Sequence, residues 1–249
     1  MGGATVSGQE RNAQFTRALA ELRSMVLRGQ FEASHRLGET SLAERLGISR
    51  TPIRQAMDRL VQEGLLERIE TGGCRVASFS FDDIVDAIEL RGVLEGTAAR
   101  LAAERGADPD LLEEAGSVLK GLDAAVADPG RIDFPSYVRL NARFHDLIAR
   151  MSGSAMVVRE VKRAARLPVA SPSAFLQGQE VIPDFRDSLT RAQSQHRAIF
   201  DAIVSREGSR AEHLTREHAR LARQNLEYVM NEKPSLAERV PGLALVSSG

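Results

Sequence analysis

The 249-residue sequence has little of what several large protein classes require. Its single cysteine, Cys74, cannot form an intramolecular disulfide or a zinc site with several thiolates. There is no tryptophan and only 4% of the residues are aromatic, which argues against a sugar-binding protein and a β-sandwich. The sequence contains no run of about 18 apolar residues, and its N-terminus lacks the features of a signal peptide. We therefore expect a mainly helical, cytoplasmic protein with no membrane partner.

The length allows two domains, each with its own hydrophobic core. The residue pattern and the net charge of the sequence change near Val76. Residues 1–76 hold 11 arginines and 9 acidic residues, a net charge of +2, whereas the remainder holds 22 basic and 25 acidic residues, a net charge of −3. The asymmetry is small and often arises by chance, but its sign favours an N-terminal module that contacts a polyanion.

The N-terminal part has the pattern of a winged helix-turn-helix. Residues 1–11 are expected to form a disordered tail. Apolar spacing predicts three helices, with Thr40 or Ser41 capping the second and Ser49 the third, at residues 12–27, 42–46 and 50–63. Two short apolar runs around the Thr71-Gly72-Gly73 turn predict a β-hairpin over residues 65–69 and 74–77.

After Phe79 the pattern is helical throughout. Gly, Pro and Asp residues separate six amphipathic segments, which predict an antiparallel bundle with helices near residues 82–104, 109–126, 135–151, 154–166, 185–206 and 209–231. The prolines and small residues of 167–183 predict a loop, of a kind that often lies over an opening. Residues 233–249 are expected to be an irregular tail.

Two arginines stand at the start of the third predicted helix. Arg50 and Arg54 are four residues apart and therefore share one polar face. In a winged helix-turn-helix this helix enters the major groove, where a guanidinium group can donate two bonds to guanine O6 and N7. Ser49, Thr51 and the first backbone amides are suited to holding phosphates. An isolated Ser-Arg-Thr is often an ordinary solvated turn, but the flanking helix, glycine turn and wing favour DNA reading.

The stretch from Phe15 to Ala77 resembles the DNA-binding domain of the GntR family of bacterial transcription regulators. The resemblance is carried by Leu42-Ala43, by Leu46-Gly47-Ile48-Ser49-Arg50-Thr51-Pro52-Ile53-Arg54-Gln55-Ala56-Met57, and by Glu63-Gly64-Leu65. The helical remainder, particularly Asp86 to Glu95, resembles the FadR-type (FCD) ligand-binding bundle, and the number of helices suggests its VanR-like branch. One departure is Ser34-His35, where the family usually carries Pro-Gly.

The resemblance implies an architecture and a set of DNA contacts. It implies a mainly α protein with a winged helix-turn-helix over residues 12–79 and an all-α bundle of about six helices over residues 80–232 that binds an effector and dimerises. Arg50 and Arg54 would read bases, Thr51 would contact the backbone, and the wing tip would reach a minor groove. The expected DNA-contacting residues are Thr40, Ser49, Arg50, Thr51, Arg54, Thr71 and Gly72.

Three of the five histidines occupy positions where leucine would be expected on the core-facing stripes of three different helices. Buried imidazoles hydrogen-bond one another poorly, whereas a divalent metal accepts a lone pair from each. A lone inward histidine is usually an ordinary core residue, but three of them with a helix-spaced asparagine favour a metal site. Its expected ligands are Asn141, His145, His196 and His218. Many bundles of the resembled family hold a metal in this way, and the ion could be zinc, nickel or manganese.

A metal with these neutral ligands keeps its full charge and an open position, which favours a small carboxylate as the effector. Arg91 could point into the same cavity and pair with that carboxylate, and Glu95 lies one helical turn away. The alternative is that Arg91 and Glu95 form a surface ion pair of small value.

These patterns predict a homodimeric, non-enzymatic transcription regulator, a repressor that binds a palindromic operator and senses a small organic acid at the metal site. Two alternatives remain open: a metal-dependent hydrolase fused to a DNA-binding domain, and a constitutive DNA-binding protein without an effector. The hydrolase lacks a general base beside the ligands, because Asp146 points about 100° away from His145 around the helix.

Overall fold

The computed structural model describes residues 3–128, 131–165, 171–172, 184–231 and 242–246. The chain divides into two compact units, one formed by residues 1–81 with 241–249 and the other by residues 82–240. No helix in the described part of the chain is long and apolar enough to cross a membrane.

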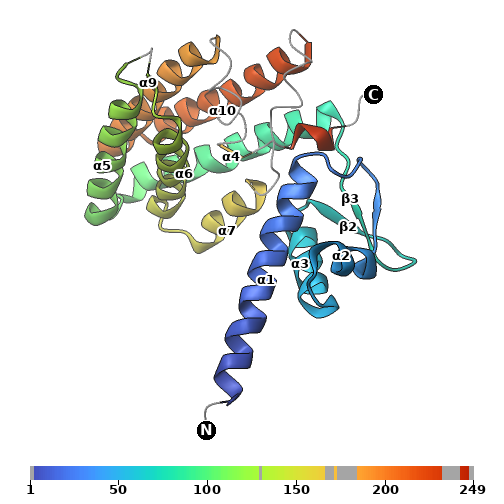
Figure 1. The fold of residues 1–249 in the computed structure, drawn as a ribbon. Coiled ribbons are helices and arrows are strands. Elements are labelled where there is room, and N and C mark those ends of the chain that lie inside the picture. Colours follow the sequence, from blue (N-terminus) through green and yellow to red (C-terminus); the bar gives the residue numbers. More distant parts are fainter. Residues whose placement is uncertain (1–2, 129–130, 166–170, 173–183, 232–241, 247–249) are drawn as a thin grey trace. The chain divides into compact units, whose positions relative to one another are not determined.

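The first unit is the predicted winged helix-turn-helix (Figure 1). Its helices are α1 (Gly3–Leu27), α2 (Glu39–Leu46) and α3 (Arg50–Gln62), and its wing strands are β2 (Leu66–Arg68) and β3 (Cys74–Val76). A further strand, β1 (Arg36–Leu37), pairs antiparallel with β3 and gives the sheet order β1-β3-β2. Strand β1 was not predicted, because two residues are too few to show an alternating pattern.

Three local expectations for this unit are wrong. Helix α1 begins at Gly3, so residues 3–11 are helical and not a disordered tail; extending a helix that is already anchored costs far less than starting one. Helix α2 begins at Glu39 with Gly38 at its N-cap, so Thr40 and Ser41 lie inside the first turn. Ser49 does occupy the N-cap of α3, but its side chain makes no capping hydrogen bond.

The end of the chain belongs to the core of this first unit. Leu245, in the short 3-10 helix η2 (Leu243–Leu245), is fully buried in the same apolar cluster as Leu22 and Leu60. Two backbone hydrogen bonds hold the segment: Gly242 N–H donates to Leu27 O at 3.0 Å, and Phe79 N–H donates to Leu245 O at 2.9 Å. This part of the expected irregular tail is therefore ordered by long-range packing.

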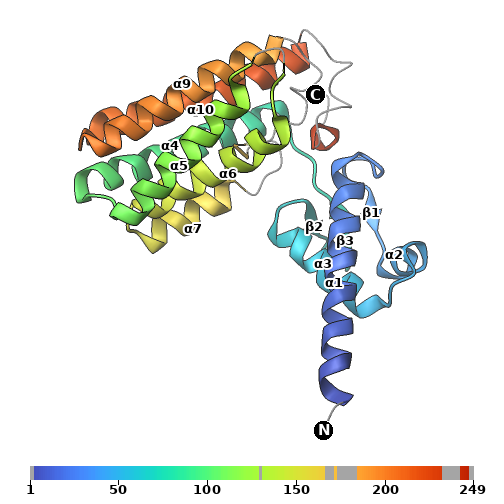
Figure 2. The same cartoon turned by 60° about the vertical axis from the view of Figure 1, so that its left-hand side comes forward.

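The second unit contains the six predicted helices, each within two residues of its expected bounds (Figure 2). They are α4 (Phe81–Arg105), α5 (Pro109–Val126), α6 (Phe134–Met151), α7 (Ala155–Ala164), α9 (Asp184–Val204) and α10 (Gly208–Asn231). Asp108 and Asp133 cap α5 and α6 through their carboxylates, and each cap is closely followed by a proline. The predicted loop at 167–183 lies outside the described residues except for 171–172.

Helix α5 packs on α6 and α9, and α9 packs on α10. Helix α4 also approaches α10 very closely. A Cβ atom added at Gly92 would lie only 2.8 Å from the Cβ atom of Ala219. A larger residue at this crossing would push the two helices apart. The close approach brings the middle of α4 next to the helix that carries His218.

Candidate metal centre and nucleic-acid interface

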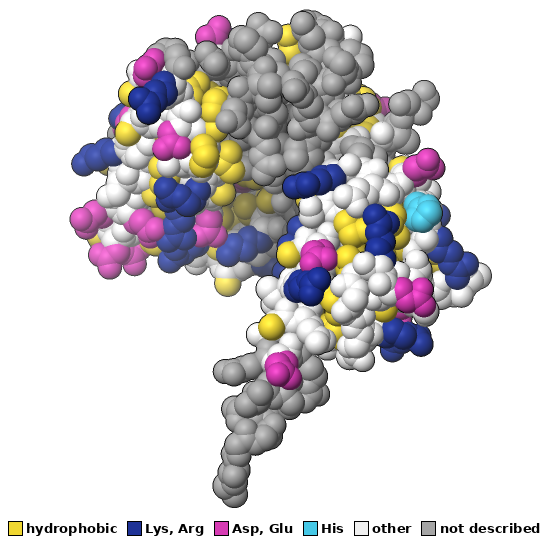
Figure 3. All heavy atoms as spheres, in the orientation of Figure 1, with side chains coloured by type: hydrophobic (Ala, Val, Ile, Leu, Met, Phe, Trp, Pro, Cys, Tyr) yellow, Lys and Arg dark blue, Asp and Glu magenta, His cyan; other side chains and the backbone are white. Residues whose placement is uncertain are grey.

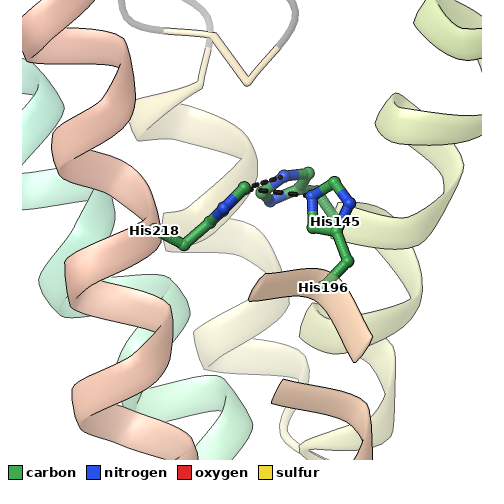
Figure 4. Close-up of side chains that lie close together, drawn as sticks. All are labelled: His145, His196 and His218. Atoms are coloured by element: carbon green, nitrogen blue, oxygen red, sulfur yellow. Dashed lines mark hydrogen bonds between the residues drawn. The ribbon is translucent and has the colours of Figure 1, made fainter. Parts of the chain in front are cut away.

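The three core histidines meet inside the second unit (Figure 4). His145 projects from α6, His196 from α9 and His218 from α10, and their exposed fractions are 4%, 0% and 8%. The Nε2 atom of His218 lies 3.0 Å from Nε2 of His196 and 3.4 Å from Nε2 of His145. One ring nitrogen from each helix therefore faces a common point, as the sequence analysis expected.

The outer nitrogens of the three rings each face an acceptor oxygen. His196 Nδ1 lies 3.1 Å from Gln193 Oε1 and His218 Nδ1 lies 3.0 Å from Gln195 Oε1 in hydrogen-bond geometry, whereas His145 Nδ1 lies 3.2 Å from Glu95 Oε2 without that geometry. The two hydrogen bonds favour the tautomer with the proton on Nδ1 in His196 and His218, which leaves their Nε2 lone pairs directed inward. The assignment follows from the surrounding acceptors.

Burial keeps two of the rings neutral. It lowers the pKa of His196 and of His218 well below 6.5, and neighbouring His145 lowers both further. In this tautomer the Nε2 atoms of His196 and His218, 3.0 Å apart, cannot hydrogen-bond each other, because both are acceptors. The donor set fits a divalent transition metal, which accepts all three lone pairs.

The sequence analysis missed the role of the two glutamines. The amide group of Gln193 donates to Leu119 O at 3.3 Å and to Asp123 Oδ1 at 2.8 Å. Because both donations use Nε2, Oε1 must face His196. Gln193 lies one helical turn before His196 on α9, and that spacing is the signal that could have indicated it.

Asn141, the fourth expected ligand, is buried one turn before His145 on α6. It lines a cavity of about 40 Å³ together with His218. Its amide Nδ2 donates to Pro172 O at 3.2 Å, so the hydrogen bond uses the nitrogen, whereas a metal would bind the oxygen.

Arg91 and Glu95 pair with each other, but inside the protein and not at its surface. Arg91 Nη1 donates to Glu95 Oε2 at 2.9 Å, and the side chains are 2% and 1% exposed. The surface-pair expectation is therefore wrong, because α4 packs this face against the bundle. Neither residue lines the described cavity. Burial alone would raise the pKa of Glu95, but the charge of Arg91 and the nearby His145 lower it to about 2.

Asp146 has no part in the histidine cluster. Its carboxylate lies 3.0 Å from Arg143 Nη1 and 3.2 Å from Lys162 Nζ, on the outer side of α6. This agrees with the expectation that Asp146 points away from His145, but a different carboxylate, that of Glu95, does lie beside the cluster, 3.2 Å from His145 Nδ1.

The seven expected DNA-contacting residues are all exposed on the first unit. Arg50 and Arg54 project from the first turns of α3 and share a partner that the sequence analysis did not identify. Glu39 accepts two hydrogen bonds of 2.8 Å from Arg54 and lies 3.7 Å from Arg50. The Arg54 side chain is 59% exposed, so this ion pair is open to solvent and exchangeable.

The wing tip contains two further members of the set, Thr71 and Gly72. Gly72 has a φ of +94°, a backbone conformation that favours glycine, and its carbonyl accepts a 3.0 Å hydrogen bond from Arg36 of β1. Arginine side chains therefore lie beside the wing tip as well as on α3. Figure 3 shows basic side chains standing out on the visible face of this unit, with acidic side chains among them.

Two family profiles match the chain. The one described as "Bacterial regulatory proteins, gntR family" matches residues 15–76, and the one described as "FCD domain" matches residues 86–221. The first covers the helices and wing of the DNA-contacting unit, and the second covers all three histidines and Asn141. Together they account for both units.

Full-length relatives agree with these matches. The chain is 28% identical to an uncharacterised HTH-type transcriptional regulator, YdhC, of Bacillus subtilis, over 85% of this chain and 90% of the relative. It is also 28% identical to the HTH-type transcriptional repressor GlaR of Escherichia coli, over 79% and 88%. The solved structure of E. coli McbR/YncC has a similar fold, with a TM-score of 0.62 at 21% identity over 88% of this chain and 99% of that one.

Proposed function

Because the chain belongs to the GntR family of bacterial regulatory proteins and carries an FCD domain, and is therefore a DNA-binding transcription regulator and not an enzyme, we propose that it is a metal-dependent repressor. In this proposal it binds a palindromic operator as a homodimer. A small carboxylate that binds at the histidine cluster of the bundle changes its affinity for DNA.

The exposed surface of α3 supports the DNA-binding part of the proposal. Arg50 and Arg54 lie at the helix end that enters the major groove in this motif, and each could discriminate a guanine by about 1–3 kcal/mol. Ser49 keeps its hydroxyl out of the capping interaction, which leaves it available for a phosphate oxygen. Two-fold symmetry would double these few contacts, as operator-level specificity requires.

The convergence of three Nε2 atoms, two of them on rings whose Nδ1 is hydrogen-bonded to a glutamine oxygen and the third on a ring beside Glu95, carries the proposal for the bundle. His145, His196 and His218 would hold a divalent ion, with Asn141 as a further ligand. When bound, such an ion supplies a Lewis-acid position for an anion. The surrounding residues supply orientation: the glutamines and Glu95 fix the rings, and the packed helices exclude water from them.

Charge explains why the effector would be an anion. The four ligands are neutral, and Arg91 offsets the charge of Glu95 behind His145. The full charge of a divalent ion would therefore remain uncompensated within a low-dielectric interior. An anionic ligand would gain both a coordination bond and Coulomb attraction.

The proposal is tested by measuring bound metal after purification and by a mobility-shift assay with and without small carboxylates. We expect about one divalent ion per chain and a DNA complex that one of the acids weakens. His196→Ala should lose both the ion and the response, whereas His213→Ala should lose neither, since His213 is exposed and bonded to Ser209 O on the outer face of α10.

Asn141→Asp tests the charge argument separately. A carboxylate in place of the amide should tighten metal binding and weaken the binding of the acid, because part of the attraction is already satisfied. Calorimetry on metal-loaded protein measures both affinities. Unchanged or stronger acid binding in this variant would exclude an anion that completes the metal's coordination.

A further inference from the structure

The small cavity beside the histidines is built in three levels along α6, α9 and α10. The first level is His218, the member of the histidine cluster that lines the cavity. One turn further along lie Asn141 on α6, Ala192 on α9 and Ala222 on α10. Another turn away lie Tyr137, Ser188 and Asn225. The helices keep this register because α6 and α9 run in one direction and α10 runs in the other.

The middle level is lined by small residues, whereas the far level is polar. Alanine at 192 and 222 leaves space between the helices that a leucine would fill. In contrast, Tyr137, Ser188 and Asn225 place a phenol, a hydroxyl and an amide at one end of the cavity. Tyr137 and Asn225 are buried and Ser188 is half-buried. An apolar core would be the more stable filling, so polar groups at this end of the cavity indicate a ligand.

One of the three polar groups has no partner among the residues that the structure describes. The Tyr137 side chain is fully buried, and its hydroxyl makes no hydrogen bond within the described residues. Burial also raises its pKa, so the phenol stays protonated and remains a donor. Ser188 donates to Asn225 Oδ1 at 3.3 Å, which orients that amide. The far level therefore offers uncharged hydrogen-bonding groups.

No lysine or arginine lines the described part of the cavity. The buried Arg91 is held in the pair with Glu95. A second carboxylate at the far level would be buried without a counter-charge, which costs several kcal/mol. A neutral hydroxyl would instead satisfy Tyr137.

We propose that the effector is a monocarboxylic acid with a hydroxyl group at the end distant from its carboxylate, and that Tyr137, with Ser188 and Asn225, recognises this hydroxyl. The inference rests on the proposed function, because the carboxylate end is placed at the metal. Tyr137 is thereby a specificity residue and not a metal ligand.

The helix geometry sets the length of the acid. Tyr137 precedes His145 by eight residues, or about 12 Å along the axis. About 2 Å of this is a metal–oxygen bond and about 3 Å is a hydrogen bond, leaving roughly 7 Å for a chain of about four to six carbon atoms. The cavity of about 40 Å³ is smaller than such an acid, so its walls must move outward on binding. A sensor protein requires a ligand that changes the shape of the protein in this way.

The test uses zinc-loaded protein and three acids of similar length: 4-hydroxybutyrate, butyrate and succinate. Calorimetry should show 4-hydroxybutyrate binding about tenfold more tightly than butyrate, the effect of one satisfied buried hydrogen bond. Succinate should bind at least about tenfold more weakly than 4-hydroxybutyrate, because its second carboxylate meets no cation.

Tyr137→Phe removes only the hydroxyl and should abolish the preference for 4-hydroxybutyrate over butyrate. Zinc content and thermal stability should stay at wild-type values, and Ser188→Ala should reduce the preference independently. The matched control is Tyr228→Phe, which removes the chain's other tyrosine hydroxyl from a position outside the cavity and should leave the preference intact.

Three results would overturn the inference. Equal affinity of the wild type for 4-hydroxybutyrate and butyrate, or an unchanged preference in Tyr137→Phe, would reject the hydroxyl site while leaving an acid sensor in place. Tight succinate binding would indicate a cation at the far level. If none of the acids binds zinc-loaded protein, the proposed sensing function fails and this inference fails with it.

Discussion

The two units each contain an arginine–glutamate pair of nearly the same length, but the pairs have opposite properties. Arg54 and Glu39 meet at 2.8 Å on the surface that we propose contacts DNA, where their side chains are 59% and 25% exposed. Arg91 and Glu95 meet at 2.9 Å inside the bundle, where they are 2% and 1% exposed. Distance alone therefore does not distinguish a temporary contact from a permanent one.

Exposure to water explains why the two ion pairs differ in strength. An exposed pair contributes about 0–1 kcal/mol, so Arg54 can leave Glu39 for a guanine or a phosphate at little cost. A buried pair cannot be separated without leaving a charge in the protein interior, which costs about 3–5 kcal/mol. Arg91 and Glu95 are therefore fixed, and Glu95 can serve as a rigid acceptor behind His145. The same chemistry gives an adaptable surface in one unit and a scaffold in the other.

Neutralising the buried carboxylate of Glu95 should have the largest effect on stability. Glu95→Gln leaves Arg91 without a counter-charge and should lower the free energy of unfolding by about 3–5 kcal/mol, measured by urea denaturation. Metal affinity should also fall about 10–100-fold, because His145 loses its charged acceptor.

The control for this variant lies on the same helix. Glu104→Gln breaks the exposed Arg100–Glu104 pair of the same i, i+4 spacing and should cost less than about 0.5 kcal/mol. Equal costs for the two variants would show that burial does not separate the two kinds of pair.

The second prediction tests whether Leu245 stabilises the DNA-binding unit and not the bundle. Leu245 lies at the end of the chain but is buried in the core of the DNA-binding unit, so Leu245→Ala should destabilise that unit by about 2–4 kcal/mol. Metal content of the bundle should not change. Hydrogen exchange resolved along the chain measures both units, and equal loss of protection in α6 and α10 would contradict the assignment.

The third prediction concerns the adaptable surface. Arg50→Ala should lose about 1–3 kcal/mol of discrimination per half-site while leaving folding and metal content unchanged. Binding to cognate and scrambled operators at matched salt concentrations gives the discrimination. A variant that still prefers the cognate site would exclude Arg50 as a base-reading residue.

The fourth prediction uses pH to examine the buried site. The pKa values of His196 and His218 lie below 6.5 in the folded protein, so the unfolded chain binds more protons as the pH falls below 6.5. Stability of the metal-free protein should drop by about 1 kcal/mol per histidine between pH 6.5 and 5.5. Denaturation at both values measures the drop.

Glu95 acts in a different pH window. Its pKa is lowered from 4.5 to about 2, so its stabilisation is complete above pH 4.5 and is lost as the pH falls toward 2. The double variant His196→Gln, His218→Gln should therefore lose most of the dependence between pH 6.5 and 5.5. A drop equal to that of the wild type would place its origin elsewhere.

The smallest expected effect belongs to the exposed pair itself. Glu39→Gln releases Arg54 and removes one negative charge from the DNA-facing surface, which should raise affinity for non-specific DNA about two- to fivefold at low salt. Stability should change by less than about 1 kcal/mol. A fluorescence anisotropy titration would detect the gain, and weaker binding would show that Glu39 positions Arg54 for DNA.

The sequence by itself determined the helices, the wing and the histidine set, because these features depend on local signals. Each bundle helix follows from its apolar spacing and its cap or proline, and His145, His196 and His218 were recognisable as polar residues on apolar stripes. The same rule predicted that His213 faces outward and that Asp146 turns away from the cluster. Asn141 was predicted from its spacing of four residues before His145, and the resemblance to a known family agreed with it.

Only the tertiary structure decided which distant residues support these features. The pairing of β1, the burial of Leu245, the contact of Glu95 with His145 and the level formed by Tyr137, Ser188 and Asn225 all join segments far apart in the chain. An i, i+4 spacing shows that Arg91 and Glu95 can meet, but it does not show on which side of the helix water lies. Burial is a property of the packed bundle, and burial determines whether that pair is weak or fixed.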